Sequence, residues 1–415
     1  MTVVSSQLAI SAKVGEGSYM STASPLLGLI FHWIGGFAAA SFYIPYRHVR
    51  RWSWETYWLA GGIFSWILAP SIFALLLVPG AWEIVRSASP SVLTEAFVFG
   101  ALWGVGGLTF GLTMRYLGIA LGMAVALGFC TVFGTLVPPI FHGTFVSGVV
   151  DLTSGKVILI GVGVTVIGIA VSGLAGMSNE CLLSDQKKKE STKEFNFGKG
   201  MLIAMFSGIM SSCMAFGLDA GKPITAEAQK VLVAAGRSDI WDGLPLLIVI
   251  LLGGFTTNSL WCLFLNVRNR TGGEYLAVPD DTGSLHGATN QVAAAMSLDS
   301  ALDSNVATAP APAEDEQKSV QLWINYAFCA LAGVTWYLQF FFYTMGQAKL
   351  GKDFDFSNFT LHMASIIIFS TLWGIALHEW SGTSRRTHIY IALGLFMLVG
   401  ATVVIGYGNY LAPPK

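Results

Sequence analysis

The sequence contains little charge. Its 24 acidic and 23 basic residues make 11% of the chain, whereas a soluble globular protein carries roughly 25%. The net charge of −1 leaves no basic surface that could bind nucleic-acid phosphates. Apolar residues make 53% of the chain and the mean hydropathy is +0.62, which disfavours both a soluble enzyme and a disordered chain. The composition indicates a protein that crosses a lipid bilayer several times.

Several functional motifs are also absent. The five cysteines show no CxxC pairing, so they predict neither a disulfide framework nor a zinc site. No phosphate loop of the GxxxxGKS or GxxxxGKT type occurs, so the chain is not itself an ATPase and implies no ATPase subunit. The HExxH motif and the GxSxG elbow are missing as well. We expect no metal and no cofactor.

Long apolar runs bounded by charge are what the sequence does contain. None of them includes Asp, Glu, Lys or Arg, and period-2 alternation is absent, so we expect membrane helices and not barrel strands. The ten predicted windows are Leu26–Tyr46, Tyr57–Val78, Ala96–Met114, Tyr116–Phe141, Val157–Ala175, Gly200–Leu218, Gly243–Leu265, Val320–Gly346, Ser357–Leu377 and Ile389–Leu411. The predicted fold is an all-α integral membrane protein.

The ends and loops of the chain indicate an orientation. The first 24 residues are polar and lack an apolar core, so we expect no removable signal peptide. The loops after the first, third, fifth, seventh and ninth windows hold 14 of the 23 Lys and Arg residues. Because cytoplasmic loops carry the excess of these residues, we expect these loops inside and both termini outside.

The windows divide into two sets of five. The predicted parts are a polar extension at 1–25, a first repeat at 26–177, a charged link at 178–199 and a second repeat at 200–408. Small-residue stretches in the first and sixth windows, and Thr-Met stretches in the third and eighth, can be aligned. Five helices per repeat give the two repeats opposite orientations, as in many secondary transporters.

One long loop interrupts the second repeat. Residues 268–319 are poor in large apolar groups and rich in Ala, Ser, Thr, Asp, Gly and Pro. Such a composition buries too little apolar area to offset the entropy of ordering. We expect a disordered loop without a part in the chemistry.

Two imidazoles lie inside the windows, His32 and His362. With the termini outside, each lies about 8–9 Å below the outer end of its helix at 1.5 Å per residue, so the two could line one cavity. An imidazole changes charge near neutral pH, as a proton carrier must. With carboxylates outside all windows, these two residues are the first candidates for proton coupling. The alternative is a neutral histidine that is hydrogen-bonded between helices.

Aromatic and amide residues in the windows suggest a ligand. A sugar offers an apolar ring face to Trp and hydroxyl groups to Asn, Gln and Tyr. The candidate substrate-binding residues are Trp33, Trp103, Trp336, Tyr337, Gln339 and Asn258. Membrane aromatics commonly serve as interface anchors or packing groups instead. The amides favour function, because a buried amide costs free energy unless it is paired.

Two charged residues lie at helix ends. Arg115 follows the third window, and Asp219 follows the sixth. Both are expected to be solvated ends, with Lys222 as a surface partner for Asp219. The functional alternative is that Arg115 acts as a gate, or that Asp219 takes part in proton coupling.

Several stretches resemble one known family, the bacterial L-rhamnose–proton symporters. The resemblance is carried in one order by His32-Trp33-Ile34-Gly35, Phe42-Tyr43-Ile44-Pro45, Arg50–Thr56, Gly111–Gly118, Trp336–Tyr343 and Leu361-His362-Met363. It covers nearly the whole apolar chain, from about 26 to 408. The family is similar to the ten-helix drug/metabolite transporter superfamily. The resemblance implies two inverted five-helix repeats, alternating access and sugar import driven by a proton across the bacterial inner membrane.

The sequence departs from that family at two polar positions. Where the family has Gly-Asn-Ile-Asn-Tyr-Gly in the third helix, this chain has Gly106–Gly111 without the two asparagines and the tyrosine. The Gly-His-Ala after the eighth helix is Gly346-Gln347-Ala348 here. These changes leave a related sugar open beside L-rhamnose. The alternatives are a metabolite exporter or exchanger of the same fold, and an integral-membrane enzyme, which the absence of carboxylates in the windows disfavours.

Overall fold

The computed structural model describes residues 24–117, 119–180, 196–277, 322–350, 355–378, 380 and 382–411. Within these residues the chain is helical and has no strand. Ten helices are long and apolar enough to span a membrane: Pro25–Tyr46, Trp54–Leu77, Pro90–Met114, Leu121–Phe141, Thr153–Ser178, Phe197–Ala220, Asp239–Asn269, Leu322–Leu350, Ser357–Ala376 and Arg385–Tyr410. Each overlaps one predicted window, so the prediction of ten membrane helices is confirmed.

The spans are built from the following helices. They are α2 (Pro25–Ser41) with α3 (Tyr43–Tyr46), α4 (Trp54–Gly62) with η1 (Ile63–Leu68) and α5 (Ala69–Leu77), α7 (Pro90–Leu117), α8 (Ile119–Phe141), α9 (Thr153–Glu180), α11 (Phe197–Ala220), α13 (Leu244–Asn269), α15 (Leu322–Leu350), α16 (Asp355–Ala376) and α17 (Arg385–Tyr410). Short helices join them: α6 (Ala81–Ser87), η2 (Val146–Val150), α12 (Lys222–Ala234), η3 (Asp239–Trp241) and η4 (Gly272–Tyr275).

Two helix ends differ from the predicted windows in ways that matter for function. The second span begins at Trp54 and therefore includes Glu55, which is fully buried. The expectation that all carboxylates lie outside the spans is wrong at Glu55, and also at Glu95, Asp219, Asp239 and Asp242 near the ends of three other spans. The predicted windows stopped at the nearest charge, whereas the helices continue past it. At the second helix end, the predicted loop 268–319 begins too early, because residues 268–277 include the end of α13 and the short helix η4. The remainder of the predicted loop, 278–319, lies outside the described residues, as do residues 1–23 and most of the charged link.

The second span contains a local irregularity. The π-helix η1 precedes Pro70, which is the second residue of α5. Proline has no backbone N–H and clashes with the carbonyl four residues earlier, which here belongs to Trp66. The wider turn of a π-helix accommodates that clash. As a result, Ser65 and Trp66 are turned into the protein and both are buried.

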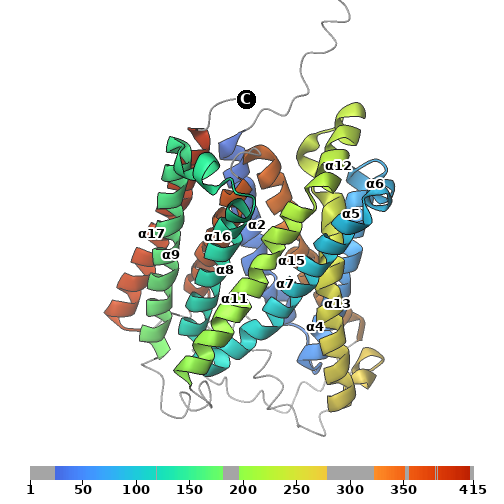
Figure 1. Cartoon of the computed structure of the whole chain (residues 1–415). Coiled ribbons are helices and arrows are strands. Elements are labelled where there is room, and N and C mark those ends of the chain that lie inside the picture. The colour runs from blue at the N-terminus through green and yellow to red at the C-terminus, as the bar shows by residue number, and fades with distance from the viewer. Residues whose placement is uncertain are drawn as a thin grey trace, which may run out of the picture.

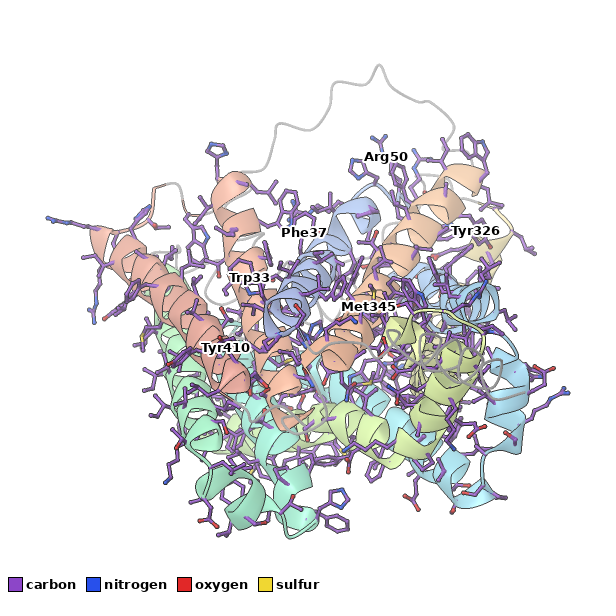
Figure 2. The ribbon with its side chains drawn as sticks, turned by 90° about the horizontal axis from the view of Figure 1, so that it is seen from above. Trp33, Phe37, Arg50, Tyr326, Met345 and Tyr410 are labelled. Atoms are coloured by element: carbon purple, nitrogen blue, oxygen red, sulfur yellow. The ribbon has the colours of Figure 1, made fainter. Side chains whose placement is uncertain are left out.

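The helices form one bundle. In Figure 1, α9 and α17 lie at one side and α4, α5 and α13 at the other, with α7 and α11 crossing between them. The helix α2 packs against both α15 and α16, and the view from above places it between these two helices (Figure 2). Because the first span carries the candidate residue His32 on α2 and continues into α3, the neighbours of α2 define the surroundings of that residue.

Small residues let α2 approach its neighbours closely. A Cβ atom on Gly36 would overlap Ser365 of α16, and one on Gly28 would lie 2.6 Å from a side-chain carbon of Leu350 in α15. Membrane helices pack through such small residues, because lipid supplies no hydrophobic force that drives helices together. The predicted small-residue run of the first helix therefore serves helix packing, and it holds His32 at the junction of three helices.

Candidate functional site

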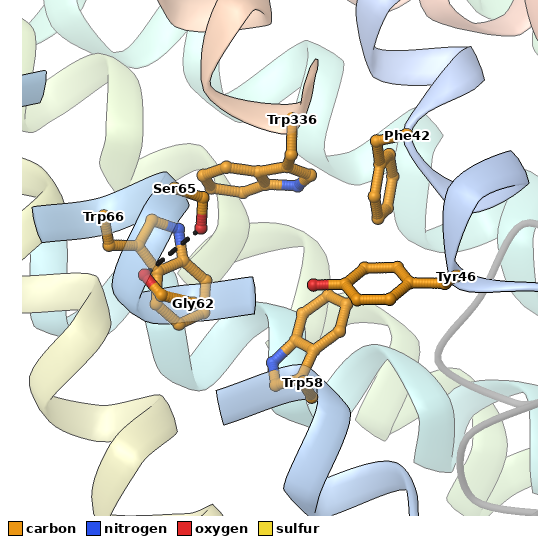
Figure 3. A pocket seen from close by; sticks show the side chains of 7 residues that line it. All are labelled: Phe42, Tyr46, Trp58, Gly62, Ser65, Trp66 and Trp336. Atoms are coloured by element: carbon orange, nitrogen blue, oxygen red, sulfur yellow. Dashed lines mark hydrogen bonds between the residues drawn. The ribbon is translucent and has the colours of Figure 1, made fainter. Parts of the chain in front are cut away.

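A cavity lies between α3, α4, η1 and α15, next to Phe42, which joins α2 to α3. It is lined by Phe42, Tyr46, Trp58, Gly62, Ser65, Trp66 and Trp336. Figure 3 shows the indole ring of Trp336 on one side of the space and the rings of Trp58 and Tyr46 on the other. The lining residues include no charged side chain.

The spacing of the lining residues on α4 and η1 places them on one helix face. Trp58, Gly62 and Ser65 follow one another at intervals of four and three residues, and residues at such intervals share a face. Two glycines keep the space open: a Cβ on Gly61 would overlap the Tyr46 hydroxyl, and one on Gly62 would lie 3.2 Å from the Trp66 ring. The shape of the cavity therefore depends on glycine at these two positions.

Trp336 is the centre of an aromatic cluster at the cavity wall. Its ring centroid lies 5.4 Å from that of Trp66, 5.7 Å from that of Trp103 and 5.0 Å from that of Phe340. Aromatic rings prefer such separations, and the pairs with Trp66 and Phe340 are edge-to-face. Gly254 of α13 leaves the room that Trp103 occupies behind Trp336. The cluster holds the Trp336 ring in a fixed orientation against the cavity.

The polar groups at the cavity are mostly donors. Trp58 Nε1 donates to Asn258 Oδ1 at 3.2 Å, and Asn258 Nδ2 donates to the carbonyl of Gly254 at 2.9 Å. The Tyr46 hydroxyl makes no hydrogen bond to any residue that the structure describes. Trp66 Nε1 is buried without a hydrogen-bond partner, and its ring lies edge-on to Trp336. A neutral ligand with an apolar face and hydroxyl groups matches this combination.

A second polar cluster lies where α2, α15 and α16 meet, nearer the opposite end of these helices. The rings of His32 and His362 have centroids 6.1 Å apart, and Tyr343 contacts both edge-on at 5.1 and 5.2 Å. Both histidines are buried. The structure thus brings together the two imidazoles that the sequence singled out, although they come from helices more than 300 residues apart.

The two histidines have few hydrogen-bond partners. His32 Nε2 lies 2.9 Å from Asn358 Oδ1, and because an amide oxygen only accepts, the ring nitrogen donates. His32 Nδ1 and both nitrogens of His362 have no partner. A buried polar atom without a partner costs about 1–3 kcal/mol, so these three nitrogens are an unusual feature of the cluster.

The other predicted substrate residues have different surroundings. Gln339 donates from Nε2 to the carbonyl of Trp336 in its own helix at 2.9 Å. Tyr337 is fully buried and stacks on Phe73 of α5. Trp33 packs edge-on against Phe369 of α16. Unlike Trp336, these three side chains do not line the cavity.

The two predicted helix-end residues lie apart from both clusters. Asp219 forms ion pairs with Lys222 at 2.6 Å and with His142, which follows α8. It therefore links the ends of α8 and α11 and makes no contact with His32 or His362. Arg115 belongs to α7, but its side chain lies outside what the structure describes.

Six lining residues were not candidates in the sequence analysis: Phe42, Tyr46, Trp58, Gly62, Ser65 and Trp66. A signal for some of them exists, because Trp58 and Trp66 are eight residues apart and therefore share a helix face. Nothing in the sequence separates these tryptophans from those that anchor a helix at the membrane interface. In the part of the chain that the structure describes, no three His, Cys, Asp or Glu side chains come together as a metal site.

Comparison with known proteins points in one direction. The sequence model of the family described as L-rhamnose-proton symport protein matches residues 20–272 and 315–410. The chain is 33% identical over 383 residues to the L-rhamnose-proton symporter of Yersinia pestis (strain Pestoides F), covering 92% of this chain and 98% of that relative. It is 33% identical over 382 residues to the L-rhamnose-proton symporter of Cronobacter sakazakii, covering 92% of this chain and 97% of that relative.

Proposed function

Because the chain belongs to the L-rhamnose–proton symport protein family, we propose that it imports L-rhamnose or a related sugar together with a proton. It is a multi-pass protein of the bacterial inner membrane and a transporter, not an enzyme. The proton is its coupling ion, and the cycle proceeds by alternating access. The observation that carries the proposal is the uncharged aromatic cavity, since its lining matches a neutral sugar.

The sugar site is proposed to be this cavity. Trp336 offers an indole face to the apolar side of the sugar ring, and Trp103 supports it from behind. Asn258 acts through Trp58, whose N–H it binds. The Tyr46 hydroxyl and the Trp66 N–H are available to sugar hydroxyls. We assign Gln339, Tyr337 and Trp33 a packing role around this site.

The proton site nearest the outside is proposed to be the pair His32 and His362. The pair is buried and has three ring nitrogens without partners. His32 lies on α2, whose span continues into the lining residues Phe42 and Tyr46, and Tyr343, which contacts both imidazoles, lies on α15 with the lining residue Trp336. A proton on the pair can therefore influence the sugar site through the position of these two helices. Asp219 already has two basic partners, which makes it the weaker candidate for proton coupling.

Two inverted repeats are the proposed architecture, as in the drug/metabolite transporter superfamily. Helix packing supports it: α2 packs against α15 and α16 in the same way as α11 packs against α7 and α8. If each span is matched to the span five places away in the other half, the contacts of α2 correspond to those of α11. The contacts between α9 and α17, and between α8 and α16, each join two matched spans and therefore correspond to themselves. The proposed repeats are residues 26–177 and 200–408, joined by the link at 178–199.

The orientation proposed from the Lys and Arg count puts both termini outside. The histidine pair then lies in the outer half of the membrane and the aromatic cavity reaches toward the inner half. Arg115, at the inner end of α7, is proposed as a gate residue of that face. These assignments order the site residues along the direction of transport.

Uptake of a panel of labelled sugars into membrane vesicles tests the proposed function. With an imposed inward proton gradient, we expect accumulation of L-rhamnose or a related deoxysugar, and alkalinisation of the medium when the sugar is added without a gradient. The sugar recovered from the vesicles should be chemically unchanged. Accumulation that ignores the proton gradient, or efflux driven by it, would contradict the proposal and favour an exchanger or exporter.

A further inference from the structure

A network of buried polar residues ties the start of α4 to the end of α13. Glu55 Oε1 accepts from Asn269 Nδ2 at 2.9 Å and from Thr271 Oγ1 at 3.0 Å. In the reverse direction, Glu274 Oε2 accepts from the backbone N–H and the hydroxyl of Ser53 at 2.7 and 2.8 Å. Each segment thus supplies one carboxylate and the donors for the other. The network closes the inner end of the seam between the two helices.

Glu55 is an unusual carboxylate for a membrane helix. Its side chain has 0% exposure, and its second oxygen, Oε2, is buried without any partner. Neither Glu55 nor Glu274 forms an ion pair with a residue that the structure describes. Burying a carboxylate without a cation is costly, and a bound proton removes most of that cost. The free Oε2 atom is where such a proton fits.

The network also has too few hydrogens for its acceptors. Thr271 has one hydroxyl hydrogen but lies within hydrogen-bonding distance of both Glu55 Oε1 and Asn266 Oδ1. Thr56 faces the same choice between Asn266 and Ser53. A change of charge on Glu55 therefore rearranges the hydrogen bonds of the network, because each of these hydroxyl groups can rotate from one acceptor to the other.

The same seam leads from this network to the aromatic cavity. Along one face of α13, Asn258 binds the cavity residue Trp58, Cys262 is buried in the cluster around Trp54, and Asn266 binds Thr56. Asn258 and Asn266 are eight residues apart, which is about 12 Å along a helix. Glu55 therefore lies below the cavity, on the side opposite to the histidine pair.

We propose that Glu55 is a proton-binding residue of the transport cycle and releases the proton at the inner face. Resting on the proposed function, this assigns a second proton site beyond the histidine pair. In the state with a closed inner end, Oε2 takes a proton that reaches it from the outside through the cavity. When the seam between α4 and α13 opens, the O–H bond breaks, the proton passes to water on the inner side and the carboxylate regains its charge.

The two oxygens of Glu55 have different parts in this step. A carrier must close its inner end both with and without the proton. The two donors on Oε1 stabilise the charged form while the empty carrier returns, and the free Oε2 stays open for the proton.

No other titratable group near Glu55 replaces it in this role. The titratable and charged groups near this end of the packed elements are Tyr46 of α3, Cys262 and Arg268 of α13, Glu274 and Tyr275 of η4 and Tyr326 and Cys329 of α15, with Arg50, Arg51 and Arg270 in the adjoining loops. Burial raises the pKa of Tyr275 to about 12, so its phenol stays protonated. Glu274 Oε2 already accepts two hydrogen bonds from Ser53, one from the backbone N–H and one from the hydroxyl. Glu55 alone among these carboxylates has a buried oxygen without a partner.

The test compares two kinds of sugar transport in the variant E55Q. Glutamine has the shape of a protonated glutamate but cannot release a proton. We expect accumulation driven by a proton gradient to fall at least about tenfold, while counterflow of labelled against unlabelled sugar stays near the wild-type rate. Counterflow needs no deprotonation, and it also proves that the variant is folded. Accumulation with normal pH dependence in E55Q would overturn the proposal.

The matched control is E274Q, in the same network. Its amide oxygen can still accept from Ser53, so we expect it to retain proton-driven accumulation. If E274Q lost accumulation but kept counterflow while E55Q kept both, the assignment to Glu55 would be wrong. If E55Q loses counterflow as well, infrared difference spectra test whether Glu55 binds a proton. The wild-type protein should lose a carboxylic-acid band as the pH is raised, and E55D should shift that band. Wild-type uptake without proton coupling would instead contradict the proposed function itself.

Discussion

Replacement of Trp336 by leucine tests the aromatic cavity most directly. A buried tryptophan covers about 200 Å², and a sugar stacked on one indole face covers about a third of that area. At ~25 cal/mol per Å² this contact contributes about 1.7 kcal/mol, which corresponds to roughly fifteenfold in affinity. Leucine preserves the helix and fills part of the volume behind the cavity, so most of the loss should appear as weaker sugar binding. Binding of the labelled sugar to the purified protein measures it.

The neighbouring Tyr337 offers a matched control. It belongs to the same helix and was also predicted to bind the sugar, but it is fully buried against Phe73 and its hydroxyl has no partner. Tyr337→Phe removes only that hydroxyl, so we expect sugar affinity within about twofold of wild type. If Trp336→Leu bound the sugar as well as wild type, or if Tyr337→Phe weakened binding more than Trp336→Leu, the sugar site would not be the cavity around Trp336.

Three further predictions concern the proton site and the orientation. Gly346→Ala would place a Cβ atom 2.8 Å from His32 Nε2. The imidazole ring must then move, and proton-driven sugar accumulation should fall about tenfold. Gly163→Ala, where a Cβ atom would have nothing within 4 Å, is the control in the same uptake assay. His32→Gln cannot change charge and should impair accumulation more than counterflow, with His362→Gln for comparison; an unchanged pH dependence would make His32 a packing residue. Protease added to intact cells should not cut residues 268–319, and cleavage there would reverse the orientation.

The membrane helices could be predicted because lipid imposes a strong constraint on composition. A span must exclude charge and satisfy its backbone internally, so apolar windows between charges identify each helix. The same rule misjudged the helix ends. It began the second helix at Tyr57, after Glu55, whereas the helix begins at Trp54 and buries that carboxylate. A charge at the edge of a window can be buried by a neighbouring segment such as η4, and hydropathy does not detect this.

The candidate site could be predicted only in part. His32 and His362 stood out because imidazoles are rare within apolar windows, and the structure places their rings 6.1 Å apart. The aromatic lining was harder to find, since tryptophan has the same composition signal in a ligand site and at a membrane interface. What separates Trp66 from Trp33 is the direction of the side chain. That direction depends on the π-helix before Pro70 and on helix packing, which a single sequence does not reveal.

The order of polar groups along the bundle has a physical reason. A charged group beside a neutral sugar would need water or a counter-ion in the cavity, and either would compete with the stacking contact on Trp336. In this protein the histidine pair lies toward one end of the cavity and Glu55 toward the other, while the lining itself includes no charged side chain. Sugar and proton must then influence each other through helix position. The first span carries His32 and the lining residues Phe42 and Tyr46, α15 carries Trp336 and Tyr343, which contacts both histidines, and α4 carries Trp58 and Glu55. A movement of any of these helices that changes the cavity therefore also changes the environment of a proposed proton site, which is the linkage that coupled transport requires.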